Sequence, residues 1–180
     1  LGAPITLLVV GSDCQAAASE AANIAGVSKV IVADSQAYAH QLPEAVAPLV
    51  VQAAAGFAHV LAPATTTGKN LMPRVAALLD VAQVSDIVAI KSADTFVRPI
   101  YAGNALATVQ SGDPVKVITV RTTAFAEAAS EGGSASIDAL DTVIEQSVAS
   151  FVSEELSVSE RPSLSSASII ISGGRGMQSG

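Results

Sequence analysis

The chain has 180 residues, of which half are hydrophobic, only 3% are aromatic and 14% are charged, with a formal net charge of −7. This length allows one domain, or one domain and a piece of a second. The acidic balance argues against a nucleic-acid partner, because neutralising phosphates requires clustered Lys and Arg. A single cysteine, Cys14, excludes a disulfide framework and a cysteine-based zinc cluster. No apolar run approaches the ~18 residues needed to cross a bilayer, so direct membrane insertion is not expected.

Strands and helices alternate through the first half of the chain. Apolar runs predict strands at 5–10, 29–33, 59–62 and 86–90. The segments between them predict helices at 14–25, about 43–55 and 68–80. Gly26 suits the end of the first helix, and Pro43 suits the first turn of the second. This order predicts right-handed βαβ units, and therefore an α/β fold with a mostly parallel, layered sheet.

The pattern changes after residue 95. Residues 96–109 and 115–121 read as extended strands joined by a turn at 111–114, which predicts antiparallel strands added to the parallel sheet. Residues 124–139 are rich in small side chains and are expected to form a surface loop. The apolar spacing in 141–151 fits a helix about as well as a strand, and the polar segment 153–166 is expected to be a linker.

The segment from Thr65 to Asn70 contains a Gly-Lys pair that invites comparison with a phosphate-binding loop. That loop needs a glycine five positions before the pair and a hydroxyl after the lysine, and Pro63 and Asn70 occupy those positions. A strand-to-helix turn capped by a hydroxyl is therefore the favoured interpretation.

Other reactive side chains lack the partners that chemistry would need. Glu44 lies four positions after His40, but Pro43 breaks the helix that would align the two side chains. His59 has no ligand-type neighbour, and both histidines are interpreted as structural. Cys14 stands at a helix start, where its pKa could be lowered, but a small core residue is the favoured interpretation.

The segment after the fourth strand carries Lys91, Asp94 and Arg98. They could form an ion-pair cluster or a partner surface, and a solvated rim is favoured. The small residues of 101–105 suggest close approach of another backbone, at a domain or subunit contact.

The end of the chain is the strongest cofactor candidate. Residues 167–171 predict a buried strand, and a glycine-rich turn follows with Gly174, Gly176 and Ser179 in a near match to the dinucleotide fingerprint. Arg175 adds a fixed cation with bidentate geometry, suited to a pyrophosphate or a reduced flavin. On spacing alone, a cofactor turn and an ordinary turn with a surface arginine are equally supported.

Several segments together resemble the alpha subunit of electron transfer flavoproteins. They occur in the family's order at 68–76, 85–87, 96–105, 116–121, 132–136, 160–162 and 172–176. The block Tyr-Ala-Gly-Asn-Ala at 101–105 is the most specific part of the match.

The resemblance implies a subunit of an αβ heterodimer that carries electrons and is not itself an enzyme. It would accept them on FAD from acyl-CoA and related flavin dehydrogenases, in fatty acid β-oxidation and amino acid catabolism, and pass them to a membrane quinone oxidoreductase. AMP would lie in the beta subunit. The location would be the mitochondrial matrix, or the cytoplasm of a bacterium.

The resemblance also implies a division of the chain. Residues 1–159 would be the N-terminal α/β domain, similar to adenine nucleotide hydrolase-like folds, and 160–180 would be a linker and the first strand of an α/β FAD-binding domain. Among the family's flavin contacts only Arg175 falls within this chain, where it would stabilise the anionic form of the flavin. The alternative function is an adenine-nucleotide-binding α/β domain of the universal stress type.

Overall fold

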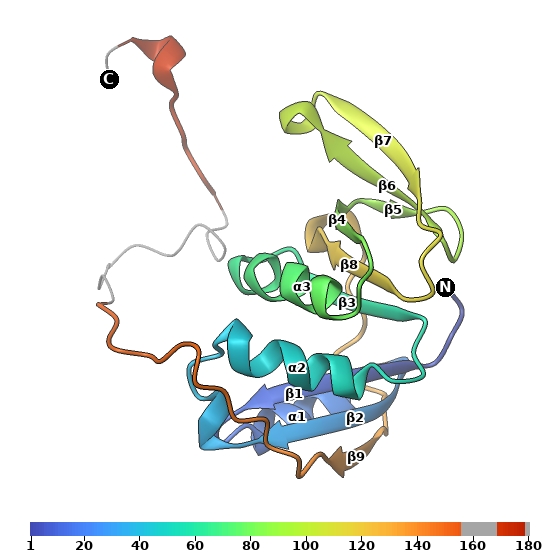
Figure 1. Ribbon diagram of the computed structural model, residues 1–180. Helices are drawn as coiled ribbons and strands as arrows, with labels where there is room; N and C mark the ends of the chain where they lie inside the picture. The colour runs from blue at the N-terminus through green and yellow to red at the C-terminus, as the bar shows by residue number, and fades with distance from the viewer. Residues whose placement is uncertain (156–168, 179–180) are drawn as a thin grey trace.

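The computed structural model describes residues 1–155 and 169–178. Nine strands and three α-helices lie in the first of these ranges, arranged as three three-stranded sheets with the helices packed against them (Figure 1). The predicted α/β class with parallel strands is confirmed, and the antiparallel addition forms a sheet of its own.

The first parallel sheet has the order β1-β2-β9 and the second has the order β3-β8-β4. Their strands are β1 (Ile5–Gly11), β2 (Val27–Asp34), β9 (Ser136–Ala139), β3 (His59–Pro63), β8 (Lys116–Val120) and β4 (Gln83–Ile87). All four strand pairs in the two sheets are parallel. The third sheet, β5-β6-β7, is antiparallel and consists of β5 (Ala89–Ile90), β6 (Thr95–Ile100) and β7 (Ala105–Gln110).

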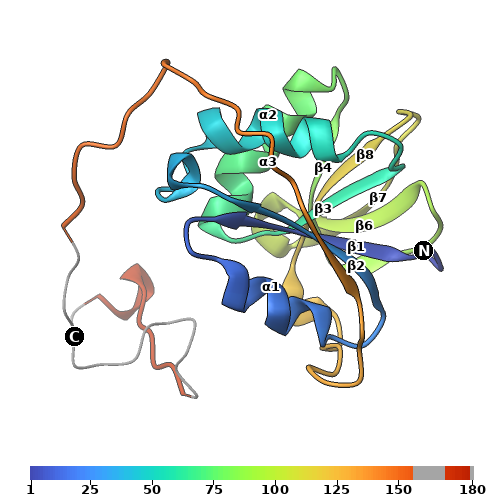
Figure 2. The same ribbon diagram turned by 90° about the horizontal axis from the view of Figure 1, so that it is seen from below.

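The three helices follow the strand-to-helix connections that the sequence predicts. They are α1 (Gln15–Ala22), α2 (Pro43–Ala53) and α3 (Thr66–Leu78). Pro43 lies in the first turn of α2, where its missing N–H costs nothing. Helix α1 covers one face of the first sheet, while α2 and α3 pack against each other on the opposite side (Figures 1 and 2).

One main core connects the two parallel sheets. Its buried side chains come from α2, α3, β2 and β8, with fully enclosed Leu49, Val75 and Val117 at its centre. Tyr38, in a short 3₁₀ turn (Gln36–Tyr38), closes this core and is only 1% exposed. Smaller clusters fill the space under α1 and beneath the antiparallel sheet.

The second half of the chain differs from the sequence prediction in three places. Residues 96–109 are not one strand: Tyr101, Ala102 and Gly103 all have positive φ and reverse the chain, so that β6 and β7 form a hairpin. The turn at 111–114 therefore leads to β8, which lies between β3 and β4 and is parallel to both. The predicted strand at 86–90 is divided between the end of β4 and β5, with a break at Val88. Within β4, Asp86 has a φ of 58° and the register with β8 shifts between Val84 and Ile87.

The expected surface loop at 124–139 ends in a strand. Backbone hydrogen bonds from Gly133 to Asn23 and from Ala135 to Ala22 hold it against the end of α1, and β9 then pairs with β2. A side chain at Gly133 would overlap the backbone of residues 23 and 24, so glycine is required for this close approach.

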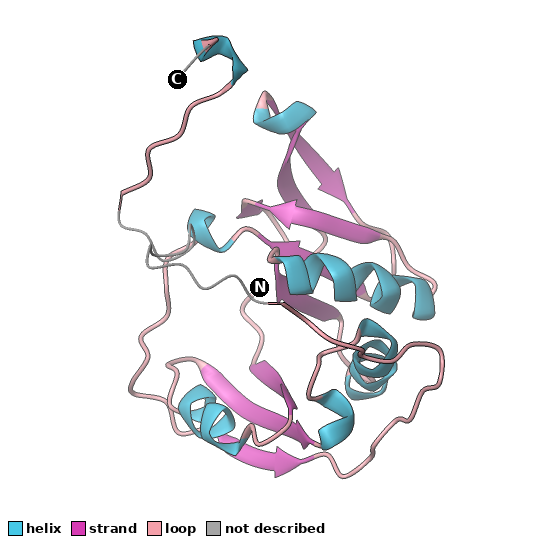
Figure 3. Ribbon diagram, turned by 90° about the vertical axis from the view of Figure 1, so that its left-hand side faces the viewer, coloured by secondary structure: helices cyan, strands magenta, loops and turns pink. Residues whose placement is uncertain are grey.

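Residues 141–151, whose apolar spacing fitted a helix about as well as a strand, form neither, and belong to a longer irregular segment at 140–155. This segment runs as an extended strap over the body, where Leu140 and Ile144 pack on the main core (Figure 3). Most of the expected linker, with the proposed domain boundary at 159, lies outside the described residues, so the domain division stays a prediction.

The predicted strand at 167–171 is not found in its described part. Residues 169–171 belong to no strand, and Ile169 and Ile171 are 83% and 95% exposed. A strand needs a neighbour to satisfy its backbone groups, and none of the described residues pairs with this segment.

Candidate functional site

The carboxyl ends of the second parallel sheet carry a cluster of charged side chains. Asp86 near the end of β4 and Arg121 directly after β8 form an ion pair. The buried hydroxyl of Thr119 accepts a hydrogen bond from the Asp86 backbone N–H at 2.8 Å. Because the strands are parallel, their carboxyl ends meet at one edge, where α/β folds commonly bind ligands.

The electrostatics of this cluster favour an ionised Asp86. The hydrogen bond from Arg121 is the main reason that the pKa of Asp86 lies below its ordinary value, and the charges of Arg121, Lys69 and Arg98 act in the same direction. The same hydrogen bond raises the pKa of Arg121. Asp86, Arg121 and Lys69 line a hollow of about 240 Å³, whose other lining residues include Thr65, Thr122 and Thr123. Sequence reasoning missed this cluster, because it placed β8 in an antiparallel hairpin.

The turn before α3 is a helix cap, as the sequence favoured. The Thr65 side chain accepts a hydrogen bond from the Gly68 N–H at 3.3 Å. A Cβ at Gly68 would overlap the carbonyl oxygen of Pro63, so this glycine permits α3 to approach β3. The Gly-Lys pair thus has a packing role, and the comparison with a phosphate-binding loop gains no support.

Both histidines have structural contacts. His59 Nε2 lies 2.6 Å from the carbonyl oxygen of Ala93, and the His40 ring stacks on Phe151 of the strap with centroids 3.7 Å apart. No group of three or more potential metal ligands occurs in the part of the chain that the structure describes.

Cys14 has no activated thiol. It directly precedes α1, and its backbone N–H donates to the Asp34 carboxylate at 3.1 Å. Partial burial, and then the nearby charge of Asp34, raise the pKa of the thiol, which leaves it protonated at neutral pH. The interpretation as a small packing residue agrees with its contacts in the cluster under α1.

Among the residues that the structure describes, the charges at 91–98 form no ion-pair cluster. Asp94 is held by hydrogen bonds from Ser92, Gln110 and Thr95, which lower its pKa well below the usual range. Arg98 donates to the carbonyl oxygen of Ser85 at 2.8 Å. The Asp94 hydrogen bonds close the base of the β6–β7 hairpin, and the Arg98 hydrogen bond joins the hairpin to β4.

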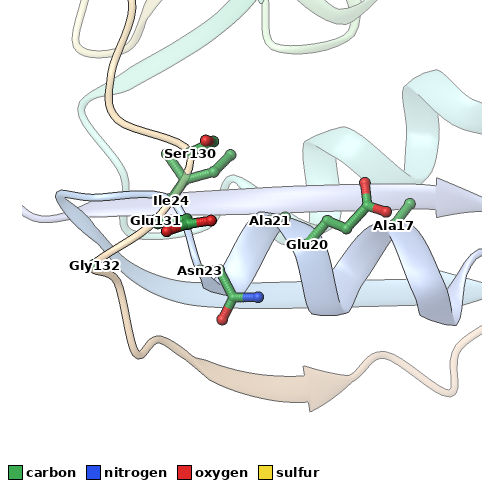
Figure 4. A pocket seen from close by; sticks show the side chains of 8 residues that line it. All are labelled: Ala17, Glu20, Ala21, Asn23, Ile24, Ser130, Glu131 and Gly132. Atoms are coloured by element: carbon green, nitrogen blue, oxygen red, sulfur yellow. The ribbon is translucent and has the colours of Figure 1, made fainter.

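A hollow of about 720 Å³ lies between α1 and the loop before β9 (Figure 4). It is lined by Ala17, Glu20, Ala21, Asn23, Ile24, Ser130, Glu131 and Gly132. Its only charged side chains are acidic, which is unfavourable for the phosphates of a nucleotide or a flavin cofactor.

Arg175 lies in the glycine-rich turn that the sequence singled out. It begins a short 3₁₀ turn (Arg175–Met177) closed by a hydrogen bond from Met177 N–H to the Gly174 carbonyl at 3.0 Å. The Arg175 side chain is exposed and forms no ion pair with the other described residues. Exposed apolar side chains at Ile169–Ile171 and Met177 accompany it. Neither Arg175 nor this turn is brought together with the cluster around Asp86.

In the described ranges, 1–155 and 169–178, no helix is both long and apolar enough to cross a membrane.

Comparison with known proteins identifies the family. The model of the electron transfer flavoprotein domain matches residues 1–144. The chain is 58% identical over 180 residues to an electron transfer flavoprotein subunit alpha of Pseudomonas aeruginosa, covering all of this chain and 58% of that protein. It is 51% identical over 175 residues to the subunit alpha of Paracoccus denitrificans (97% and 56% covered), and 42% identical over 191 residues to the mitochondrial one of Dictyostelium discoideum (98% and 54%). The chain thus spans little more than half the length of these relatives. It belongs to the electron transfer flavoprotein family.

Proposed function

We propose that this chain is part of the alpha subunit of a heterodimeric electron carrier. It would accept electrons from acyl-CoA and other flavin dehydrogenases and deliver them to a membrane quinone oxidoreductase. The observation that carries the proposal is identity of 42–58% with proteins named electron transfer flavoprotein subunit alpha, over nearly the whole chain. The universal-stress alternative has no comparable support, because the Thr65 turn is used for capping and helix packing.

The proposal divides the chain as the sequence suggested. Residues 1–159 form the N-terminal α/β domain, which contributes the scaffold and the subunit contact. Residues 160–180 begin the FAD-binding domain, and AMP belongs to the beta subunit. A relative from Dictyostelium discoideum is named mitochondrial, so the location would be the mitochondrial matrix in a eukaryote and the cytoplasm in a bacterium.

The residues around Arg175 fit one part of an FAD site. FAD presents an anionic pyrophosphate and a largely apolar ring, which call for cations and backbone donors beside apolar surface. Arg175 supplies the cation, Gly174 and Gly176 leave open space around it, and exposed isoleucines precede it. The acidic hollow beside α1 offers no comparable surface.

The electron chemistry of the carrier is supplied by FAD when it is bound. The part of this chain is to hold and orient it and to set its electrostatic surroundings. Arg175 would favour negative charge on the flavin through its fixed positive charge, which raises the reduction potential. No acid–base or nucleophilic step is assigned to any residue of the chain.

Arg175→Ala in the full heterodimer tests this assignment. We expect FAD affinity to fall about tenfold or more, as for the loss of one charge-assisted hydrogen bond, and the reduction potential to become more negative. Fluorescence titration and potentiometry measure the two quantities. Lys91→Ala removes the same charge from an exposed position and is expected to change neither. Unchanged affinity and potential in Arg175→Ala would refute the role of this residue.

The carrier role itself is tested with the wild-type heterodimer. A yellow αβ complex that is reduced by an acyl-CoA dehydrogenase and reoxidised by a quinone oxidoreductase is the expected result. A purified complex without flavin, or one that no flavin dehydrogenase reduces, contradicts the proposed function.

A further inference from the structure

The outer edge of β7 presents backbone groups that no described strand uses. The antiparallel sheet has the order β5-β6-β7, which makes β7 an edge strand (Figure 1). Pro99 of β6 lies opposite Leu106 of β7, and proline has no N–H, so this pair is not joined by hydrogen bonds. Hydrogen-bonded and non-hydrogen-bonded pairs alternate along an antiparallel ladder. The backbone groups of Leu106, Thr108 and Gln110 therefore point away from β6.

Hydrogen bonds elsewhere in the sheet give the same alternation independently. The carbonyl groups of Thr95 and Val97, which lie opposite Gln110 and Thr108, accept hydrogen bonds from Lys91 and Val88 on the far side of β6. At the base of the hairpin, the next residue after β7, Ser111, donates inward to Asp94. Three N–H groups and three C=O groups on the outer edge of β7 are thus left without a sheet partner in the described structure.

This edge has none of the features that usually prevent strand pairing. Natural edge strands are protected by proline, by charged side chains or by bulges. The sequence of β7 is Ala-Leu-Ala-Thr-Val-Gln, with no proline and no charge, and its register with β6 is continuous over six pairs. Leu106 is 66% exposed. An unprotected, uncharged edge of this kind is suited to accept another strand.

The hairpin is also held firmly in place. Phe96 of β6 is completely buried in the cluster beneath the sheet, and Arg98 donates a hydrogen bond to the carbonyl oxygen of Ser85 in β4. The hydrogen bond from Gln110 to Asp94 closes the base of the hairpin itself. At its tip, Tyr101 and Ala102 keep positive φ values of 51° and 53°. Such backbone conformations are unfavourable in non-glycine residues and are concentrated at functional positions. Tyr101, in the turn at the tip of the hairpin, is 79% exposed, as expected for an aromatic contact residue.

We propose that the outer edge of β7 pairs with an extended, uncharged strand of the beta subunit, so that the antiparallel sheet continues into the partner. This inference rests on the proposed function, which supplies the second subunit. The partner strand would hydrogen-bond to Leu106, Thr108 and Gln110 and place an apolar side chain against Leu106, with Tyr101 at the margin of the contact.

A second copy of this chain fits the edge less well. In a two-fold antiparallel pair centred on Thr108, Leu106 would face Gln110 of the other copy, and centring on Ala107 would place it opposite Thr108. Neither arrangement gives Leu106 an apolar partner across the strands. Centring on Leu106 would place it opposite itself, but β7 would then overlap with its copy only at residues 105–107. Each copy also has a net charge of −7, which opposes self-association. A strand from a different chain is bound neither by the two-fold register nor by an equal net charge of −7.

Amide hydrogen exchange in the full wild-type heterodimer tests the pairing directly, at residue resolution. Leu106, Thr108 and Gln110 are expected to exchange within about tenfold of the rates of Ala105, Ala107 and Val109, whose N–H groups face β6. Exchange at least a hundredfold faster at the first three positions, in an intact heterodimer, overturns the inference and leaves the carrier role standing. Failure of the two subunits to form any complex overturns both.

Two lysine substitutions give a second test in the same complex. Leu106→Lys places a charge on the proposed contact, whereas Ile137→Lys places one on β9, the edge strand of a different sheet. We expect Leu106→Lys to weaken subunit association at least tenfold by sedimentation after dilution, and Ile137→Lys to leave it unchanged. Equal effects of the two substitutions, or none from Leu106→Lys, would contradict pairing at β7.

Discussion

Asp86 combines a local backbone constraint with a long-range ion pair. Its φ of 58° lies in the left-handed region, which Asp and Asn tolerate better than other side-chain-bearing residues. This conformation coincides with the register shift between β4 and β8. The carboxylate pairs with Arg121, and the Thr119 hydroxyl accepts a hydrogen bond from the Asp86 backbone N–H. Asparagine can keep the same backbone and removes only the charge, so Asp86→Asn isolates the electrostatic contribution.

We expect Asp86→Asn to lower the free energy of unfolding slightly at neutral pH, because Arg121 is partly exposed and screened by water. The pKa of Asp86 is lower in the folded chain than its ordinary value of 3.8. Its contribution is therefore fully present above that value and is lost as the pH falls through the folded pKa. Urea unfolding across this range measures the difference between wild type and variant.

The difference in free energy of unfolding between wild type and Asp86→Asn should shrink on acidification. A difference that stays constant or grows as the pH falls would contradict the ion-pair role. Asp138→Asn removes the carboxylate of the more exposed pair with Lys29, and we expect little effect from it at any pH.

Residue roles that depend on neighbours in sequence could be predicted, and those that depend on distant neighbours could not. The cap at Thr65 follows from local spacing, and the structure confirms it. The pair of Asp86 and Arg121 depends on β4 and β8 being parallel and adjacent, which no local pattern reveals. The three consecutive positive φ values at residues 101–103 could not be predicted from the sequence either, because only one of those residues is glycine.

At the scale of elements, the same contrast explains the errors in the second half of the chain. The apolar run of β8 is typical of a central parallel strand buried on both faces, but it is equally compatible with a hairpin strand. Strand β9 has only exposed side chains, so no pattern of alternating burial could indicate it. The structure forms it because backbone hydrogen bonds to the end of α1 bring the segment beside β2.

The strap at 140–155 is held to the body by a small number of contacts, and one of them can be tested alone. Tyr38 Oη accepts a hydrogen bond from the Ile144 N–H at 3.0 Å. Tyr38→Phe keeps the buried ring but removes this acceptor. We expect a loss of about 1–3 kcal/mol in stability, because the Ile144 N–H is left without a partner, together with faster exchange of that amide.

Tyr101→Phe makes the same chemical change at an exposed position and is expected to be neutral in stability. Equilibrium unfolding and hydrogen exchange measure the two effects of Tyr38→Phe. If Ile144 exchanges equally fast in wild type and Tyr38→Phe, the strap is held by its other contacts, among them the stack of His40 on Phe151.

At the scale of the whole molecule, the two parallel sheets share a core although they share no strand. The residues around Leu49 come from both sheets and from the two helices between them, α2 and α3. Packing of α2 against α3 therefore couples the sheets mechanically, and the body should unfold as one unit. A pattern of alternating strands and helices predicts such layers, but it does not show which helices meet.

Leu49→Ala tests this coupling. Leu49 is fully buried, so the substitution should lower the free energy of unfolding by about 2–5 kcal/mol, and Leu78→Ala, at a half-exposed position in α3, should cost far less. Circular dichroism follows the unfolding of all helices and strands. The chain has two tyrosines, so in a Tyr101→Phe background tyrosine fluorescence follows the surroundings of Tyr38 alone. The two signals should change at the same denaturant concentration in wild type and in Leu49→Ala. Separate transitions would show that the sheets unfold independently, and that the helix pair packs between them without joining them into one cooperative body.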